Sequence, residues 1–171
     1  MTTTQPGTTT PGPRDIFERF QRDVLAGRIG FDHLAPDVVI EMPFAVPGRP
    51  RRFAGRAAFE AFARPERAAF PVRFDEFRDV VVHQTADPEV IVAEYELAGT
   101  VTTTGRQASA AFVVVLRVRD GQVVSWREYQ NALAIAAALD QLPALLSVTD
   151  RLSVTDRLSV TDQPPPPETA A

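Results

Sequence analysis

The sequence predicts an α+β fold, in which one curved and mostly antiparallel sheet wraps around helices from the first part of the chain. Two observations predict it. Apolar residues recur mainly at helical spacing up to residue 63 and then alternate with polar residues up to residue 130. Short turn-forming sequences separate the alternating segments, so consecutive strands are expected to pair as hairpins. A short C-terminal helix is expected to follow the last strand.

The first part of the chain is expected to contain three helices and one strand. The first helix begins after Pro13, because the fixed φ angle of proline suits a first helical turn, and it ends before Gly27. Its apolar face is expected to consist of Ile16, Phe17, Phe20 and Val24. A second short helix, a strand and a third helix are expected at residues 31–34, 38–42 and 56–63. A loop rich in Pro, Gly and Arg, residues 47–52, follows the strand.

Four strands with period-two alternation make up the rest of the expected sheet. They are expected at residues 72–84, 90–101, 106–119 and 122–130. The first of them is expected to be interrupted near Arg78. The turns between the strands are Ala86-Asp87-Pro88-Glu89, Thr103-Thr104-Gly105 and Asp120-Gly121. A helix rich in Ala and Leu is expected at residues 132–139.

Two tails are expected to flank one folded domain at residues 14–145. Residues 1–13 are rich in Thr, Pro and Gly and have little to bury, so they are predicted to form a disordered N-terminal tail. Residues 146–171 hold three successive copies of Leu-Ser-Val-Thr-Asp and a run of prolines. This composition predicts a solvated low-complexity tail.

The composition excludes several kinds of chemistry. The chain of 171 residues has no lysine and no cysteine, so it offers no Schiff-base amine, thiolate nucleophile or zinc-thiolate site. His33 and His83 are too few for a three-histidine metal centre and are expected to be structural or exposed, so no metal and no cofactor is expected. The net charge of −4 without a basic stripe argues against nucleic acid as a partner. With neither a signal peptide nor a long apolar run, we expect no membrane partner and a cytoplasmic protein.

The expected strand at residues 122–130 carries the main chemical candidate. Alternation places Val124, Trp126, Glu128 and Gln130 on one face. If this face turns toward the helices, Glu128 loses water, which raises the pKa of its carboxyl and suits it for donating and recovering a proton near neutral pH. The alternative is an exposed carboxylate beside an aromatic residue at a sheet edge.

Glu94 and Glu96 share one face of the expected strand at residues 90–101. If that face also points inward, two or three carboxylates share one cavity and raise one another's pKa values, so both are candidate catalytic residues beside Glu128. Alternatively, both are solvated or pair with arginines of neighbouring strands, such as Arg106 or Arg117. The candidate substrate-binding residues around the cavity are Trp126, Phe20, Met42, Phe44, Phe59 and Phe62.

Several of these motifs together resemble the SnoaL-like group of the nuclear transport factor 2-like superfamily, over residues 14–142. The most specific one is Asp-Gly-Gln-Val-Val-Ser-Trp-Arg-Glu-Tyr-Gln-Asn at residues 120–131, similar to the hairpin, strand and short helix that end the family's domain. Supporting motifs lie at residues 17–27, 38–48 and 94–100. The nearest branch is the phenazine-biosynthesis A/B type. The resemblance implies a cone-shaped, cystatin-like fold that often forms homodimers.

The resemblance also implies roles for single residues. In the phenazine A/B-type proteins the residue that matches Glu128 is an acid facing the substrate. Limonene epoxide hydrolases have an arginine and an aspartate where this chain has Glu94 and Glu96, and ketosteroid isomerases have a tyrosine where it has Phe20, so neither chemistry is implied. The histidine of the phenazine branch matches Phe62, so a phenazine precursor is not implied either.

Two functions of different classes fit these residues. The first is a cofactor-free cyclase, isomerase or dehydratase of bacterial secondary metabolism that acts on an apolar aromatic or polyketide-like molecule. In this function Glu128 moves the proton, while Glu94 or Glu96 tunes its pKa or acts as partner base. The second is a non-catalytic module for binding a hydrophobic ligand or for dimerisation. A cavity below about 300 Å³, or three glutamates open to water, would favour the second.

Overall fold

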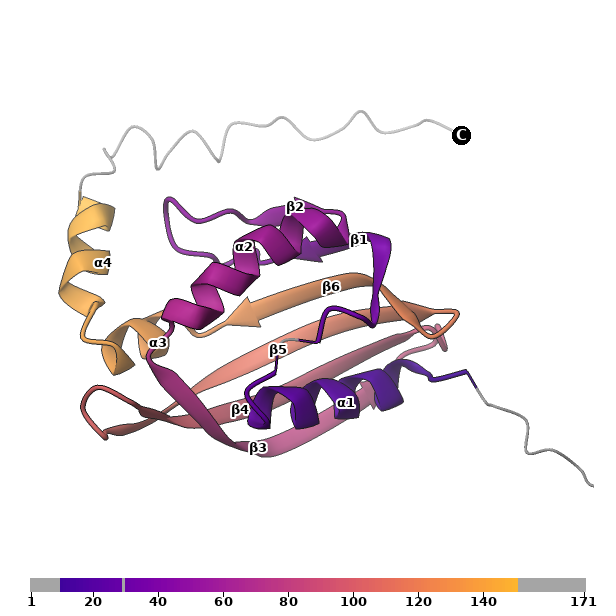
Figure 1. Ribbon diagram of the computed structural model, residues 1–171, viewed down its shortest axis with the longest axis horizontal. Helices are drawn as coiled ribbons and strands as arrows, with labels where there is room; N and C mark the ends of the chain where they lie inside the picture. Colours follow the sequence, from indigo (N-terminus) through magenta and orange to yellow (C-terminus); the bar gives the residue numbers. More distant parts are fainter. Residues whose placement is uncertain (1–9, 29, 151–171) are drawn as a thin grey trace, which may run out of the picture.

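The computed structural model describes residues 10–28 and 30–150, which form a curled six-stranded sheet packed against helices (Figure 1). The elements in chain order are α1 Pro13–Leu25, β1 Leu34–Glu41, β2 Arg52–Ala54, α2 Arg56–Ala69, β3 Val72–Gln84, β4 Val90–Val101, β5 Gln107–Arg119, β6 Gln122–Gln130, α3 Ala132–Ala138 and α4 Leu142–Asp150. Helix α1 packs against β3, β4 and β5, and α2 packs against β1 and β2. The hydrophobic core lies between these helices and the sheet face that they cover. The predicted α+β class and curved sheet are thereby confirmed.

The strands pair in the order β2-β1-β6-β5-β4-β3. The pairs β3–β4, β4–β5 and β5–β6 are antiparallel, as the turn sequences predict. One pairing differs, because β1 lies parallel to β6, with Ile40 opposite Trp126. Strand β6 therefore lies between β1 and β5 and is not an edge strand. A side chain on its helix-facing side is held by a strand on either side, which fixes its position.

Helix α1 begins where the sequence predicts. Pro13 occupies its first turn, and the Asp15 carboxylate accepts a hydrogen bond from the Gly12 backbone N–H at 2.8 Å. All four residues of the predicted apolar face belong to the core or pack against it. Gly27, with a φ of +70°, follows the end of the helix. The helix thus presents one apolar side to the sheet.

The short helix expected at residues 31–34 is wrong. A single turn, closed by the Leu34 backbone N–H and the Phe31 carbonyl at 3.0 Å, leads directly into β1. The Val123 N–H donates to the His33 carbonyl at 2.8 Å and so joins this segment to β6. Pairing with the sheet outweighs the local preference for a helix. Strand β1 consequently starts at Leu34 rather than at residue 38.

The region before β3 also differs from the prediction. The expected loop at residues 47–52 runs into a three-residue strand, β2, antiparallel to β1. Helix α2 continues past residue 63 to Ala69 although Pro65 lies inside it. Both Pro65 and Ala61 are exposed, so water can bond the Ala61 carbonyl that the proline leaves without an N–H donor. The added residues bring Arg67 to the cavity described below.

The interruption expected near Arg78 is confirmed as a bulge in β3. The pairing of β3 with β4 shifts between Arg78 and Val81, and Asp79 between them has a φ of +50°. A second shift lies between Phe74 and Glu76. Bulges bend a strand and increase its twist, so they help the sheet to curl around the helices.

The two ends of the domain agree only partly with the expected boundaries. Helix α4 runs to Asp150 and crosses the expected boundary at residue 145. The tails predicted at residues 1–13 and 146–171 otherwise fall largely outside the described residues, so their disorder stays a prediction. Within the described ranges no helix combines the length and apolarity needed to cross a membrane.

Candidate functional site

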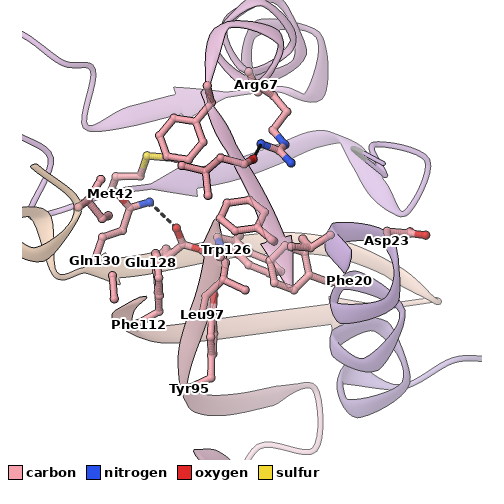
Figure 2. A pocket seen from close by; sticks show the side chains of 18 of the residues that line it. Phe20, Asp23, Met42, Arg67, Tyr95, Leu97, Phe112, Trp126, Glu128 and Gln130 are labelled. Atoms are coloured by element: carbon pink, nitrogen blue, oxygen red, sulfur yellow. Dashed lines mark hydrogen bonds between the residues drawn. The ribbon is translucent and has the colours of Figure 1, made fainter. Parts of the chain in front are cut away.

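A cavity of about 390 Å³ lies between the helices and the sheet (Figure 2). Most of its wall is apolar, and its aromatic part includes Phe20, Phe31, Phe59, Phe70, Phe74, Phe112 and Trp126. The polar and charged side chains on the wall are Asp23, Arg28, His33, Arg67, Tyr95, Ser109, Glu128 and Gln130. The volume is in the range of small-molecule sites, which is about 300 to 1,000 Å³. The cavity can therefore hold a small apolar ligand that carries a few polar groups.

Strand β6 places Trp126 and Glu128 on the cavity side of the sheet. Its alternate residues point away, and the Arg127 guanidinium binds the Glu41 carboxylate of β1 with an Nε–Oε2 distance of 2.7 Å. The cavity-side residues face apolar neighbours on β5, where Leu116 is opposite Trp126 and Val114 is opposite Glu128. Of the two orientations that the sequence allowed for this strand, the structure has the inward one.

Three side chains donate hydrogen bonds to the Glu128 carboxylate. The Trp126 indole Nε1–H donates to Oε2 at 3.2 Å, and the Gln130 amide Nε2 donates to Oε1 at 2.5 Å (Figure 2). The Tyr95 hydroxyl, from β4, also bonds to this carboxylate. The three donors come from β4 and β6, which pair with the same strand, β5. The carboxylate is thus fixed in position while one side remains on the cavity wall.

Burial and hydrogen bonding act in opposite directions on Glu128. Loss of water raises the pKa of its carboxyl, and the bonds from Gln130, Trp126 and Tyr95 lower it by stabilising the charged form. Burial is the larger effect, so the pKa is raised overall. Burial and the adjacent Glu128 charge also raise the pKa of Tyr95 well above its ordinary value, which keeps the phenol protonated as a donor. A buried carboxyl whose pKa is raised is suited to take up and return a proton during a reaction.

The structure does not bring Glu94 and Glu96 to the cavity, and the expectation that they share it with Glu128 is wrong. The buried face of β4 consists of Ile91, Ala93, Tyr95 and Leu97, so the glutamates alternate onto the opposite face. Glu94 bonds there to the His83 Nε2 of β3 at 2.9 Å, and its side chain is 56% exposed. The partner is a histidine rather than one of the suggested arginines. Tyr95, between the two glutamates, is the residue of β4 that meets Glu128.

Four of the six predicted substrate-binding residues line the cavity, namely Phe20, Met42, Phe59 and Trp126. Phe44 does not, because its side chain is 65% exposed and packs against Tyr129 on the other face of β6, with ring centroids 5.2 Å apart. Phe62 does not either. It points toward β2, where its ring centroid is 4.7 Å from that of Phe53. The expectation for these two residues is therefore wrong.

His33 lines the cavity, although the sequence suggested a structural or exposed histidine. The residue is only 6% exposed, and its buried Nδ1 is without a hydrogen-bond partner in the described part of the chain. Burial lowers its pKa, which favours the neutral imidazole. A Cβ at Gly30 would lie 2.8 Å from the Asp23 Oδ2 and 3.3 Å from the His33 Nδ1. Gly30 is the feature of the sequence that could have indicated this, because a residue without a side chain leaves room for the Asp23 carboxylate and the His33 ring beside it.

The described residues offer no group of three His, Asp or Glu side chains that could hold a metal ion. At the cavity wall Asp23 is bound by arginine, since the Arg28 Nη2 lies 2.6 Å from its Oδ1. The Glu128 carboxylate accepts hydrogen bonds from Trp126, Gln130 and Tyr95. Both carboxylates of the cavity wall thus form contacts with side chains of the protein itself.

The SnoaL-like domain family matches residues 14–126. This chain belongs to that family. The resemblance drawn from the sequence is thereby confirmed, and the cone-like fold agrees with it.

Individual relatives agree with this assignment. An uncharacterized PhzA/B-like protein of Pseudomonas aeruginosa is 34% identical over 117 residues, which are 68% of this chain and 81% of that protein. The crystal structure of a candidate isomerase of Bacillus subtilis has a TM-score of 0.69 at 24% identity, covering 75% of this chain and 93% of its own. A candidate polyketide cyclase of Xanthomonas campestris has a TM-score of 0.54 at 27% identity, with 72% and 90% covered. The SnoaL-like fold of this chain is thus shared with candidate isomerases and cyclases.

Proposed function

We propose that this SnoaL-like protein is a cofactor-free isomerase, cyclase or dehydratase that moves a proton within an apolar aromatic or polyketide-like molecule. The observation that supports it most is a single carboxyl, Glu128, whose pKa is raised by burial at the wall of an apolar cavity. The relatedness to candidate isomerases and polyketide cyclases supports the same general kind of chemistry.

In the proposed reaction the Glu128 carboxylate removes a proton from a carbon next to an electron-withdrawing group of the ligand. The electron pair of that C–H bond moves into the ligand, and Glu128 then returns the proton to another atom, so that the enzyme ends unchanged. Tyr95, Trp126 and Gln130 hold the carboxylate in place during both transfers. Low access of water keeps the carboxylate reactive, and a positioned acid or base of this kind accelerates a reaction by about 10²- to 10⁴-fold.

The Kemp elimination of 5-nitrobenzisoxazole tests this directly. In that reaction a base removes the ring C–H proton, the electrons form a nitrile, and the N–O bond breaks to give a coloured phenolate. The probe is flat and apolar, so it suits the cavity. We expect the protein to accelerate the elimination above free acetate, and we expect Glu128→Gln to lose about a hundredfold or more.

Glu94→Gln is the matched control, because it makes the same chemical change on the opposite face of the sheet. Its rate should stay within about twofold of the unaltered protein, as expected for an exposed charge. Equal rates for Glu128→Gln and the unaltered protein, or no acceleration over acetate, would contradict the proposed function.

The second candidate, a module that binds a hydrophobic ligand without converting it, is favoured by one observation. Among the described residues only one carboxyl is available to a ligand, since Glu94 and Glu96 lie outside the cavity and the Asp23 carboxylate is held by Arg28. The cavity exceeds the limit of about 300 Å³ below which this candidate would be preferred. Saturable binding of an apolar aromatic dye without any Kemp elimination would select it.

A further inference from the structure

One residue of helix α2 does not fit an otherwise apolar wall. Phe59, Ala63 and Arg67 follow one another at four-residue spacing and all line the cavity. The first two are apolar, as expected for the buried side of a helix. The third is an arginine, and Figure 2 shows its side chain directed from the helix toward the cavity. A charged side chain at an apolar wall is unfavourable unless a group of opposite charge or a hydrogen-bond acceptor compensates it.

The other charged side chains around Arg67 are already paired with each other. On the same helix Arg64 binds Glu60, and Glu66 binds Arg49. In the described part of the chain no Asp or Glu carboxylate forms an ion pair with Arg67. Glu128 is bound instead by Trp126, Gln130 and Tyr95. The charge of Arg67 is therefore not balanced by an acidic side chain among the described residues.

Two contacts position the guanidinium and leave part of it free. The Arg67 Nη1 donates to the Val72 carbonyl at 3.0 Å, and the guanidinium carbon lies 4.6 Å from the centre of the Phe74 ring. Neither contact uses Nε or Nη2, which form the edge that binds a carboxylate through two parallel hydrogen bonds. Burial also lowers the pKa of Arg67, which shows that its charge has lost part of its water. Losing water without gaining a counter-charge is unfavourable, and an anionic ligand would remove that penalty.

We propose that Arg67 binds a carboxylate group of the ligand, so that the ligand of this cavity is an apolar aromatic or polyketide-like carboxylic acid. This inference rests on the proposed function for the location of the ligand and adds the charge that the ligand carries. The ligand then has two fixed points, its carboxylate at Arg67 on α2 and its reacting carbon at Glu128 on β6. Arg67 would set which carbon reaches the Glu128 carboxylate.

A displacement assay with a matched pair of probes tests the proposal. The reporter is N-phenyl-1-naphthylamine, a neutral dye that fluoresces in apolar sites, and naphthalene-2-carboxylate or naphthalene-2-carboxamide is added to displace it from the cavity. The two competitors share size and shape and differ in charge. We expect the carboxylate to displace the dye at about tenfold lower concentration than the carboxamide, as a charge-assisted hydrogen-bonded pair would give. In Arg67→Gln this ratio should fall to about one.

Two further variants make the result decisive. Arg64→Gln removes an equal charge from the same helix at a position already paired with Glu60, and it should keep the tenfold ratio. Arg67→Lys keeps the charge without the two-bond edge, so its ratio should lie between those of the unaltered protein and Arg67→Gln. If thermal unfolding shows that Arg67→Gln does not fold, Arg67→Lys takes its place in the test.

The outcomes separate this proposal from the proposed function. A ratio near one in the unaltered protein, or an unchanged ratio in Arg67→Gln or Arg67→Lys, would overturn the role of Arg67. Failure of the dye and of both naphthalene compounds to bind would overturn it too. A ratio that depends on Arg67 in a protein that does not accelerate the Kemp elimination would support this inference and contradict the proposed function alone.

Discussion

Glu94 and Glu128 are carboxylates on two strands that flank the same strand, β5, and they differ in every property that matters for proton transfer. Glu94 lies on the uncovered face of β4, is more than half exposed and bonds to His83. Glu128 lies on the covered face of β6, and Tyr95, Trp126 and Gln130 bond to it. The pKa of Glu128 is raised by burial. The chemistry of a glutamate in this sheet is therefore set by what covers its face, and not by the strand on which it occurs.

The largest difference in stability between the two faces is expected for substitution of Trp126, whose indole lies beside Glu128. Trp126→Ala removes a buried ring that contacts Phe20 at a centroid distance of 4.8 Å, and we expect it to lower the free energy of unfolding by about 3 to 5 kcal/mol. Phe44→Ala, which truncates an exposed ring on the uncovered side, should cost less than about 1 kcal/mol. Urea unfolding of both variants measures the difference. Similar losses would show that the covered face does not carry the packing energy.

The pH dependence of stability sharpens the comparison between the two carboxyls. Folding raises the pKa of Glu128, so the folded state holds this proton more tightly than the unfolded chain. Its contribution is fully present below the unfolded pKa of about 4.3 and is lost as pH rises through the higher folded value. Relative to Glu128→Gln, the unaltered protein should therefore lose about 1.4 kcal/mol of unfolding free energy for each pH unit by which folding raises the pKa.

Urea unfolding from about pH 4 to pH 8 checks this, because the pH effects of all other groups cancel in the difference between the two proteins. Glu94→Gln, on the uncovered face, is the control and should differ from the unaltered protein by less than about 1 kcal/mol in this range. A constant difference between Glu128→Gln and the unaltered protein across this range would mean that folding does not raise the Glu128 pKa.

A smaller effect is expected from the hydroxyl that β4 supplies. The Tyr95 bond stabilises the charged form of Glu128, so Tyr95→Phe should raise the pKa of that carboxyl further. Carbon-13 NMR titration of the glutamate carboxyls measures it, with Glu128→Gln identifying the signal. Tyr129→Phe, on the opposite face of β6, should leave the titration unchanged. A lower pKa in Tyr95→Phe would contradict the bond.

The smallest effect is expected from the exposed pair on the uncovered face. Glu94→Gln alters the hydrogen-bonded contact between Glu94 and His83, whose side chains are both about half exposed. Such pairs contribute at most about 1 kcal/mol, and the unfolding free energy should change by less than about 0.5 kcal/mol near neutral pH. A loss of several kcal/mol in urea unfolding would show that this face is covered in solution, for example by a second copy of the chain.

The sequence predicted the bounds of three strands, β3, β4 and β6. Strong turn residues precede two of them, Asp87-Pro88 before β4 and Asp120-Gly121 before β6. Alternation also grouped Trp126 with Glu128 correctly. It could not choose a side for β4, because Glu94, Tyr95 and Glu96 place a carboxylate and an aromatic ring on opposite faces in either orientation. Contacts with β6, which is distant in sequence, decide that Tyr95 rather than the glutamates faces the cavity.

The parts of the site that the sequence missed depend on tertiary contacts. His33 becomes buried because the segment before β1 bonds to β6 instead of forming a helix. Arg67 was hidden because the prediction ended the helix at residue 63, before Pro65. Extending the Phe59 and Ala63 spacing by one more step would have pointed to Arg67. In both cases the tertiary contacts of the segment outweighed the local sequence preference from which the prediction was made.

The cavity is built from two kinds of wall that need not change together. The proton-carrying group and its three donors belong to β4 and β6, which are each paired on both sides, while part of the apolar boundary comes from α2 and α3. Exchanging a bulky residue for a small one on those helices would therefore reshape the space for a ligand and leave the acid where it is. Such a division lets one scaffold diversify its range of substrates by small steps, without rebuilding its reaction.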